Sequence, residues 1–238
     1  MPRARSQNLP DRQTAAADDN AGGCLSFYAL PPLAVILISC LLAALASNIP
    51  MQTSASPIVQ PVSTASTAPP ASSELSPIFT QEVQYWENNI VRWANASSLD
   101  LNLVATVIQI ESCGDPNALS RSGAMGLFQV MPFHFRYGEN GFNVETNALR
   151  GLAYLADSFQ TANGDPRLAL AGYNGGIGVI NRGEWTWHSE TARYVRYGAP
   201  IYNDARNGLA SSAALDDWHQ NYGAGLCRQA AQRLGLGN

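Results

Sequence analysis

The chain has 238 residues, a length that suits one ordinary domain with appended segments. Its formal net charge is −4, its 14 basic residues are all arginine, and it has no block of like charge, so the composition gives no support to nucleic-acid binding. The phosphate-binding pattern GxxxxGK(S/T) and the metal-binding spacings CxxC and HExxH are absent, and we therefore expect neither a metal nor an organic cofactor.

The N-terminal part of the chain has the features of a membrane anchor or a signal peptide. Residues 1–26 carry three arginines, and residues 27–46 are mostly apolar over a length of about 20 residues, which is enough to cross a bilayer. No other basic residue occurs before Arg92, which predicts that 1–26 stay in the cytoplasm and that the rest is extracytoplasmic. Because Ala44-Leu45-Ala46 resembles a cleavage site, both a membrane-anchored and a secreted product are compatible with the sequence.

Residues 47–77 differ in composition from both of their neighbours. They are rich in Ser, Thr, Ala and Pro and contain a single charged residue, Glu74. Such a segment buries too little apolar surface to offset the entropy lost on ordering, so we expect an extended, flexible spacer. The folded domain is then predicted to occupy residues 78–238.

The apolar pattern of this predicted domain is helical. Apolar residues recur at close to a 3.6-residue spacing, and Asp100 is a suitable N-cap at the start of one such segment. Alternating strand patterns are nearly absent, so the fold class is predicted to be all-α. Helices are expected over 78–93, 101–112, 147–160 and 167–173.

Glu111 is the candidate catalytic residue. It lies at the end of the predicted helix 101–112, and Val104, Val107 and Ile108 place it on the apolar face of that helix. Burial and the partial negative charge of a helix C-terminus both raise the pKa of a carboxyl group. A protonated carboxyl in a cleft is what glycosidic-bond cleavage requires. The alternative is a structural glutamate paired with an arginine or with a helix N-terminus.

Two cysteines, Cys113 and Cys227, lie in the predicted domain. An even pair in an oxidising compartment suggests a disulfide, although two buried free thiols are the alternative. A bond between them would close a loop of over 100 residues and hold the C-terminal tail beside Glu111.

A series of motifs follows in a fixed order along the chain. The motifs are Glu111-Ser112, Asn117-Ala-Leu-Ser120, Gly123-Ala-Met-Gly-Leu-Phe-Gln-Val-Met-Pro132, Asn147, Gly151, Tyr154-Leu155, Ala171-Gly-Tyr-Asn-Gly-Gly-Ile-Gly178 and Glu190-Thr-Ala-Arg-Tyr-Val195. With these motifs in this order, the sequence resembles the soluble lytic transglycosylase (SLT) catalytic domain over residues 99–202. The resemblance implies a goose-type-lysozyme-like helical fold that cleaves peptidoglycan.

The resemblance also implies a mechanism centred on Glu111. The family's glutamate protonates the glycosidic oxygen between N-acetylmuramic acid and N-acetylglucosamine. It then accepts the proton of the muramic acid C6 hydroxyl as that oxygen attacks C1, which gives a 1,6-anhydro end without consuming water. One carboxyl group suffices because the nucleophile belongs to the substrate.

The resemblance places six further residues in the substrate cleft: Ser120, Gln129, Met131, Tyr173, Asn174 and Glu190. The Tyr173 hydroxyl would orient the carboxyl of Glu111 and the sugar. Five of these positions also have a structural alternative. Gln129, Met131 and Tyr173 would otherwise pack in the core, Asn174 would hold a turn, and Glu190 would stabilise a helix N-terminus.

Several other residues have structural interpretations. Asn147 is expected to cap a helix, and Asp115 to form a turn before a proline. His134, like the other two histidines, is expected to lie at the surface or in packing. The tail 203–238 lies outside the strong match, and its Trp218, Tyr222 and Leu226 have helical spacing. We expect this tail to pack on the core, with an extension of the sugar cleft as the alternative.

Three functions are compatible with these residues. The first is a monomeric peptidoglycan lytic transglycosylase, anchored or secreted. The second is a lysozyme-type hydrolase on the same fold, which would need a water positioned by a second carboxylate. The third is a non-catalytic peptidoglycan-binding protein, and the presence of Glu111, Gln129 and Tyr173 argues against it.

Overall fold

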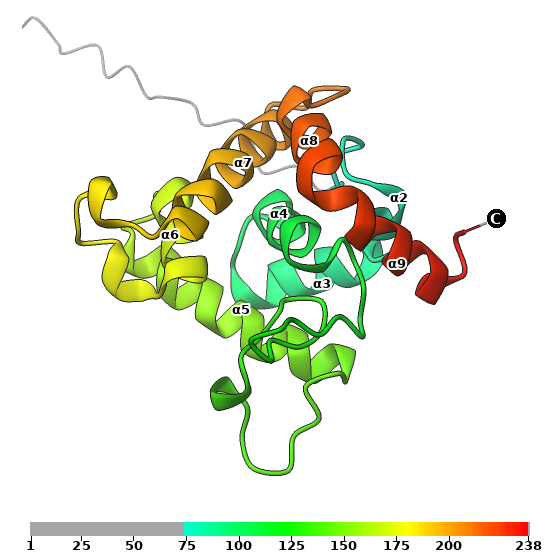
Figure 1. The fold of residues 1–238 in the computed structure, drawn as a ribbon, viewed down its shortest axis with the longest axis horizontal. Coiled ribbons are helices and arrows are strands. Elements are labelled where there is room, and N and C mark those ends of the chain that lie inside the picture. Colours follow the sequence, from blue (N-terminus) through cyan, green and yellow to red (C-terminus); the bar gives the residue numbers. More distant parts are fainter. Residues whose placement is uncertain (1–73, 238) are drawn as a thin grey trace, which may run out of the picture. The chain divides into compact units, whose positions relative to one another are not determined.

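A computed structural model describes residues 74–237, and within this range the chain folds into helices joined by loops (Figure 1). The α-helices are α2 (Gln81–Gln84), α3 (Glu87–Ser97), α4 (Leu101–Ser112), α5 (Val144–Thr161), α6 (Pro166–Gly175), α7 (Ser189–Arg206), α8 (Ala213–Trp218) and α9 (Ala224–Leu234). The shorter elements are three 3-10 helices, η1 (Pro132–His134), η2 (Ile177–Val179) and η3 (Glu184–Thr186), and a π-helical segment, η4 (His219–Gly223). The described range contains two isolated β-bridges but no strand, which confirms the all-α prediction for this range.

Most of the predicted N-terminal organisation lies outside the described residues. This holds for segment 1–26, for the apolar stretch 27–46 and for most of the predicted spacer. The end of the spacer, 74–77, is described, and there Leu75 and Ser76 are buried. Leu75 joins the main hydrophobic core, so the folded domain begins earlier than composition indicated. No helix in the described part of the chain is both long and apolar enough to cross a membrane.

Helix α4 lies at the centre of the domain, with the other helices around it (Figure 1). Asp100 caps its N-terminus as predicted, accepting hydrogen bonds from the backbone N–H groups of Asn102 and Leu103. Ten of its 12 residues are buried, because α3, α7 and α9 all contact it. The helix ends at Ser112, and the next residue, Cys113, has a φ of 52°, which is in the left-handed region. The last turn of this buried helix carries Glu111.

Helix α5 begins three residues before the predicted start. Its cap is Asn143, whose Oδ1 accepts a 3.0 Å hydrogen bond from the backbone N–H of Thr146. The predicted capping role of Asn147 is therefore wrong. Asn143 and Asn147 are one helical turn apart and both precede the apolar stripe, so the sequence pattern alone does not separate them.

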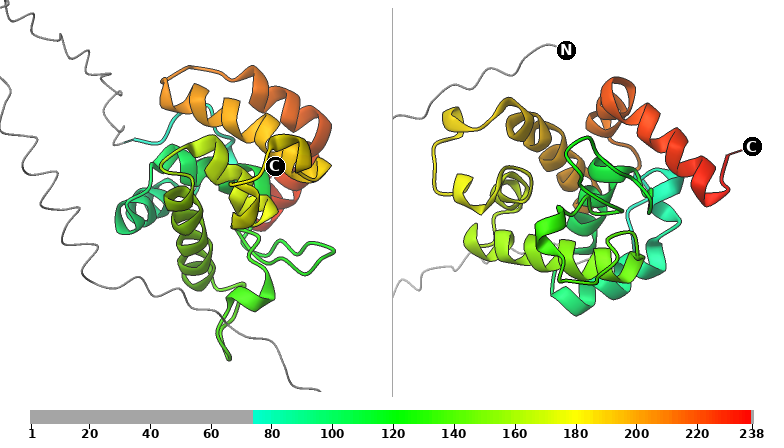
Figure 2. Two further views of the ribbon diagram at one scale, coloured as in Figure 1. Left: turned by 90° about the vertical axis from the view of Figure 1, so that its left-hand side faces the viewer. Right: turned by 60° about the horizontal axis from the view of Figure 1, so that its bottom comes forward.

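The C-terminal helices pack on the rest of the domain. Helix α8 contacts α7, and α9 contacts both α2 and α4. Figures 1 and 2 show α9 lying beside α2. Trp218 is buried, in agreement with the packing expected for the tail, whereas Tyr222 is 50% exposed. The tail therefore both covers the core and presents an aromatic side chain at the surface.

Candidate active site

Glu111 lies on the last turn of α4 and is partly buried. Desolvation raises the pKa of its carboxyl from 4.5 to about 8, with the hydroxyl of Tyr194 opposing the rise and the negative charge of Glu190 adding to it. At neutral pH the carboxyl is therefore mostly protonated. A protonated carboxyl at a cleft can donate its proton to a leaving oxygen.

Tyr194 on α7 is a neighbour of this carboxyl that the sequence interpretation did not select. Its hydroxyl favours the ionised form of Glu111, yet it is buried and has no partner at full hydrogen-bond geometry in the described structure. Burial and the charge of Glu111 raise the pKa of Tyr194 well above its usual value, so the hydroxyl keeps its proton. A signal was present, because Tyr194 follows Glu190 by four residues and shares its helical face.

A hollow of about 280 Å³ opens beside Glu111. The structure brings all the predicted cleft residues to it: Ser120, Gln129, Met131, Tyr173, Asn174 and Glu190. They come from the loop that follows α4, from α6 and from the first turn of α7. Polar and aromatic groups from separate segments thus converge on one partly buried carboxyl.

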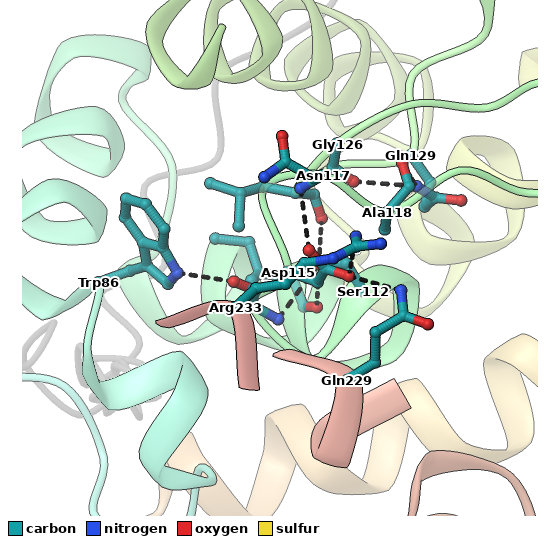
Figure 3. A network of polar contacts seen from close by, with 12 residues as sticks. Trp86, Ser112, Asp115, Asn117, Ala118, Gly126, Gln129, Gln229 and Arg233 are labelled. Atoms are coloured by element: carbon teal, nitrogen blue, oxygen red, sulfur yellow. Dashed lines mark hydrogen bonds and ion pairs between the residues drawn. The ribbon is translucent and has the colours of Figure 1, made fainter. Parts of the chain in front are cut away.

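Gln129 both borders the hollow and holds the loop in shape. Its Nε2 donates hydrogen bonds to the carbonyl oxygens of Gly126, at 2.9 Å, and Ala118, at 3.2 Å. Its φ of 46° is left-handed, so the backbone turns sharply at this residue. Figure 3 shows Gln129 beside Gly126 and Ala118. Because the amide nitrogen is engaged by the loop, the Oε1 atom is the part of this amide that remains to accept a bond from a ligand.

Asn147 fastens the same loop from the side of α5. Its Oδ1 accepts a 2.9 Å hydrogen bond from the N–H of Phe128, and its Nδ2 donates to the carbonyl oxygens of Met125 and Gly141. The backbone of Gly126 lies so close that an added Cβ would be 2.6 Å from Nδ2 of Asn147. The asparagine expected to cap a helix is thus a buried clamp on the loop that lines the hollow.

The Tyr173 hydroxyl makes a different contact from the one that the resemblance implied. It donates a 2.7 Å hydrogen bond to the carbonyl oxygen of Phe128, so its proton is directed to the loop rather than to Glu111. Burial, together with the charge of Glu111, raises the pKa of Tyr173 well above its usual value. The ring therefore borders the hollow while its hydroxyl supports the wall.

Three other predicted cleft residues have identifiable neighbours. Ser120 Oγ accepts a 2.9 Å hydrogen bond from the N–H of Ala124, within the loop. Asn174 Oδ1 accepts a 3.0 Å hydrogen bond from the hydroxyl of Thr191, which joins α6 to α7. Glu190 lies in the first turn of α7 and is exposed. Its carboxylate is thus accessible from the hollow that it lines with Glu111.

His134 and Tyr154 also line the hollow, although the sequence interpretation assigned them no role in the site. The His134 ring lies 4.6 Å from that of Tyr154, and the Tyr154 ring lies 5.8 Å from that of Tyr173. On the outer side, His134 contacts Phe133, which is 75% exposed. A row of rings therefore leads from beside Glu111 to the surface, and the expectation that His134 has only a surface or packing role is incomplete.

Comparison with known proteins identifies the part of the chain that carries this site. Residues 88–192 match the family of the transglycosylase SLT domain. The match covers 105 of the 238 residues, and it includes Glu111 and all the predicted cleft residues. A protein named transglycosylase from Enterobacteria phage PRD1 is 36% identical over 115 residues, which cover 47% of this chain and 40% of the phage protein.

A solved structure of the lytic transglycosylase Slt from Pseudomonas aeruginosa, an inactive mutant, is also similar to this chain. It matches with a TM-score of 0.38 and 21% identity, over 63% of this chain and 24% of that one. The chain thus spans less than half the length of either relative. Within the chain, the SLT match ends two residues before Tyr194, so α8, η4 and α9 all lie beyond it.

Two residues that closely follow Glu111 in the sequence, Cys113 and Asp115, hold helix α9 against the rest of the domain. Cys113 and Cys227 form a disulfide. Asp115, which is 1% exposed, accepts hydrogen bonds on Oδ2 from Gln229, at 2.8 Å, and from Arg233, at 2.6 Å (Figure 3). The other carboxylate oxygen of Asp115 accepts from the N–H of Asn117, which is the expected turn contact. Asp115 therefore forms the turn and also anchors the C-terminal helix.

The described residues contain one cluster with the side-chain composition of a metal site, formed by Glu82, Cys113 and Cys227. The two sulfur atoms of this cluster are joined in the disulfide and do not offer thiolates to a cation. The cluster therefore does not fit a metal ion.

Proposed function

We propose that this protein is a peptidoglycan lytic transglycosylase. The observation that carries the proposal is the Glu111 carboxyl, whose pKa is raised to about 8 where it borders a hollow lined by polar and aromatic side chains. The match of residues 88–192 to the transglycosylase SLT domain supports the same function. The substrate is a glycan strand of peptidoglycan, and the enzyme acts as a monomer without a cofactor.

Glu111 acts first as an acid and then as a base. Its protonated carboxyl donates a proton to the glycosidic oxygen between N-acetylmuramic acid and N-acetylglucosamine as the bond from that oxygen to C1 breaks. The C6 hydroxyl oxygen of the same muramic acid then bonds to C1, and the Glu111 carboxylate accepts the hydroxyl proton. The products are a 1,6-anhydro-muramic end and a free N-acetylglucosamine end, and the enzyme regains its proton.

The other predicted cleft residues bind and support the strand in this mechanism. Met131 and the ring of Tyr173 offer apolar surface to a sugar, whereas Ser120, Gln129 and Asn174 offer polar atoms beside it. Tyr173 also keeps the loop wall in place through Phe128. The result is a site of goose-type-lysozyme-like character around a single acid.

One observation favours a second candidate function, a lysozyme-type hydrolase. Glu190 lines the same hollow and is close enough for its charge to raise the pKa of Glu111. In hydrolytic glycosidases a second carboxylate near the acid can position the attacking water. The two functions differ in product, because hydrolysis adds a water and leaves an ordinary reducing end.

We further propose that the domain works outside the cytoplasm. The disulfide between Cys113 and Cys227 supports this, since such bonds persist in oxidising compartments. In this arrangement 27–46 serves as a membrane anchor or a cleaved signal, and 47–77 spaces the domain from the membrane. Protease accessibility of the domain in intact spheroplasts tests the location.

Mass spectrometry of purified peptidoglycan digested with the full chain tests the activity. The proposal expects 1,6-anhydro-muropeptides, about 18 Da lighter than the hydrolysis products because no water is added. Glu111→Gln is expected to abolish them. Glu87→Gln, which removes an exposed carboxylate on α3 outside the hollow, is the matched control and should retain activity. Ordinary reducing ends would establish the hydrolase, and binding without digestion would establish a glycan-binding protein.

A further inference from the structure

A second hollow, of about 180 Å³, meets the first one at Glu111. Asn174 and Glu190 also line both hollows. The remaining wall of the second hollow comes from different elements, namely the end of α4, α7 and the C-terminal segment α8–η4–α9. The cleft therefore continues past Glu111, and part of its wall there is formed by residues that lie beyond the SLT match.

The wall of this second hollow is aromatic. Tyr197, Trp218 and Tyr222 line it, and the rings of Tyr197 and Tyr222 meet edge to face at 5.5 Å. Trp218 is buried and supports the wall, whereas Tyr222 is half exposed and presents its ring to an incoming molecule. Aromatic faces of this kind offer apolar surface and a polar hydroxyl together, which suits a sugar ring.

Arg193 supplies a positive charge at this aromatic wall. Its guanidinium lies 5.2 Å from the centre of the Tyr222 ring and borders the hollow. None of the ion pairs found within the described residues involves Arg193, unlike Arg233, which pairs with Asp115. An arginine on an aromatic ring without a carboxylate partner is suited to bind an anion such as a ligand carboxylate.

Tyr194 adds a second polar group that points to a ligand. Its side chain is only 6% exposed and lines the hollow, and its hydroxyl has no partner at hydrogen-bond geometry within the described residues. Buried hydroxyls are nearly always paired, and this one interacts with the neighbouring Glu111 carboxyl without full hydrogen-bond geometry, so a polar group of a bound molecule would complete its hydrogen bonding. A buried donor, a free cation and an exposed ring thus surround one hollow next to Glu111.

We propose that this second hollow binds the peptide-bearing part of the glycan strand, with Arg193 receiving a carboxylate of the stem peptide and Tyr222 packing against the sugar that carries it. The inference rests on the proposed function, because it assumes a peptidoglycan substrate. It makes the C-terminal segment beyond the SLT match a part of the substrate site. The disulfide to Cys227 and the Asp115–Arg233 ion pair hold α9 in place, so this wall of the proposed binding site is rigid.

Binding measurements on the full chain test the proposal. Glu111→Gln serves as the background, so that turnover does not consume the ligand. Calorimetry compares a disaccharide-tetrapeptide from peptidoglycan with the same molecule after its carboxyl groups have been amidated. Arg193→Gln is expected to weaken binding of the anionic ligand about five- to tenfold, because a charge-assisted hydrogen bond is lost, and to leave the amidated ligand unchanged. Arg193→Lys should recover part of the loss, since it retains the charge.

Two further variants distinguish binding in the second hollow from a non-specific effect of the protein's net charge. Arg228→Gln removes the same charge from an exposed position on α9 that lines neither hollow, and it should bind both ligands normally. Tyr222→Ala should weaken both ligands about fivefold, because its ring packs on the sugar rather than on the carboxylate. Equal effects of Arg193→Gln and Arg228→Gln, or equal losses for both ligands in Arg193→Gln, would overturn the proposal.

The same set of proteins distinguishes failure of this inference from failure of the proposed function. Anhydro products from the wild-type chain, together with an Arg193→Gln variant that binds like wild type, would overturn the inference alone. Loss of anionic-ligand binding in Arg193→Gln, with reducing ends as the only products, would support the inference and overturn the transglycosylase activity.

Discussion

The hydroxyl of Tyr173 donates a 2.7 Å hydrogen bond to the carbonyl oxygen of Phe128. This bond joins α6 to the loop after α4, which supplies six of the 13 residues that line the first hollow. Phe128 is fully buried, and the centre of its ring lies 5.9 Å from that of Trp93 in an edge-to-face contact. It also packs so closely on Gly151 of α5 that a Cβ added there would lie 2.5 Å from Cβ of Phe128. The loop is therefore positioned from three helices at once, and its shape depends on each of them.

Removing the Tyr173 hydroxyl should loosen this loop. Tyr173→Phe leaves the Phe128 carbonyl without its side-chain partner, and we expect a loss of about 1–2 kcal/mol in the free energy of unfolding. Urea denaturation measures it. Tyr137→Phe, at an exposed position, is the control and should change stability little. An unchanged stability in Tyr173→Phe would show that the bond does not hold the loop.

Adding a methyl group at Gly151 should also destabilise the domain. A Cβ there would lie 2.5 Å from Cβ of Phe128, so Gly151→Ala overpacks the contact between α5 and the loop and should cost about 1–3 kcal/mol. Gly225→Ala on α9 is the control, and we expect it to change the free energy of unfolding in the opposite direction. A Cβ at Gly225 meets nothing within 4 Å, so alanine should stabilise the helix by about 0.5–1 kcal/mol. Thermal unfolding compares the two, and shifts of the same sign would contradict the packing argument.

The rate of glycan cleavage should depend on the protonation of Glu111. Its pKa of about 8 keeps the acid loaded at neutral pH, and the rate should fall as pH rises through about 8. The neighbouring charge of Glu190 contributes to the raised value, so Glu190→Gln should move this alkaline limb to lower pH. The pH profile of kcat/KM with soluble glycan strands measures both effects. A profile that stays flat from pH 6 to 10 would rule out Glu111 as the acid.

The same carboxyl should make the stability of the fold depend on pH. The Glu111 pKa is about 8 in the folded state against an ordinary value of 4.5, so between these values the native state holds a proton that the unfolded state releases. Stability therefore falls as pH rises through this window. Glu111→Gln removes the penalty and should stabilise the protein at pH 9 by on the order of 2–4 kcal/mol, since each pKa unit corresponds to about 1.4 kcal/mol.

Urea denaturation of wild type and Glu111→Gln at pH 4 and pH 9 checks this prediction. The two proteins should be alike at pH 4, where the carboxyl is protonated in the native state. A gain for Glu111→Gln of the same size at both pH values would mean that the effect comes from packing and not from the charge.

The disulfide should contribute strongly to stability. It joins residues 114 apart in the sequence, and the loss of chain entropy in the unfolded state predicts a contribution of about 2–5 kcal/mol. The double variant Cys113→Ser/Cys227→Ser should therefore unfold at lower urea concentration than the oxidised wild type. Because Asp115 still holds Arg233, we expect α9 to remain docked under native conditions. Treating the variant with a reductant is the control and should have no further effect.

The sequence predicted best where the signal was local. The apolar spacing and the Asp100 cap located α4, and that prediction placed Glu111 on its last turn. The motif order predicted which distant residues share a cleft with Glu111, and they line one hollow. The prediction was weaker for roles that depend on which neighbouring group a side chain hydrogen-bonds. Asn147 clamps a loop instead of capping a helix, and Tyr173 donates to Phe128 instead of to Glu111.

Three features were predictable from the sequence alone: the helical class, the buried helix that carries Glu111 and the presence of two cysteines in the domain. These features follow from periodicity, capping and composition, which act between near neighbours in the chain. Three other features became visible only in the packed fold: Tyr194 interacts with Glu111, Asp115 pairs with Arg233, and Arg193 and Tyr222 line a second hollow. Such pairings arise when helices distant in sequence pack together, and the pattern within each helix does not specify which side chains will then meet.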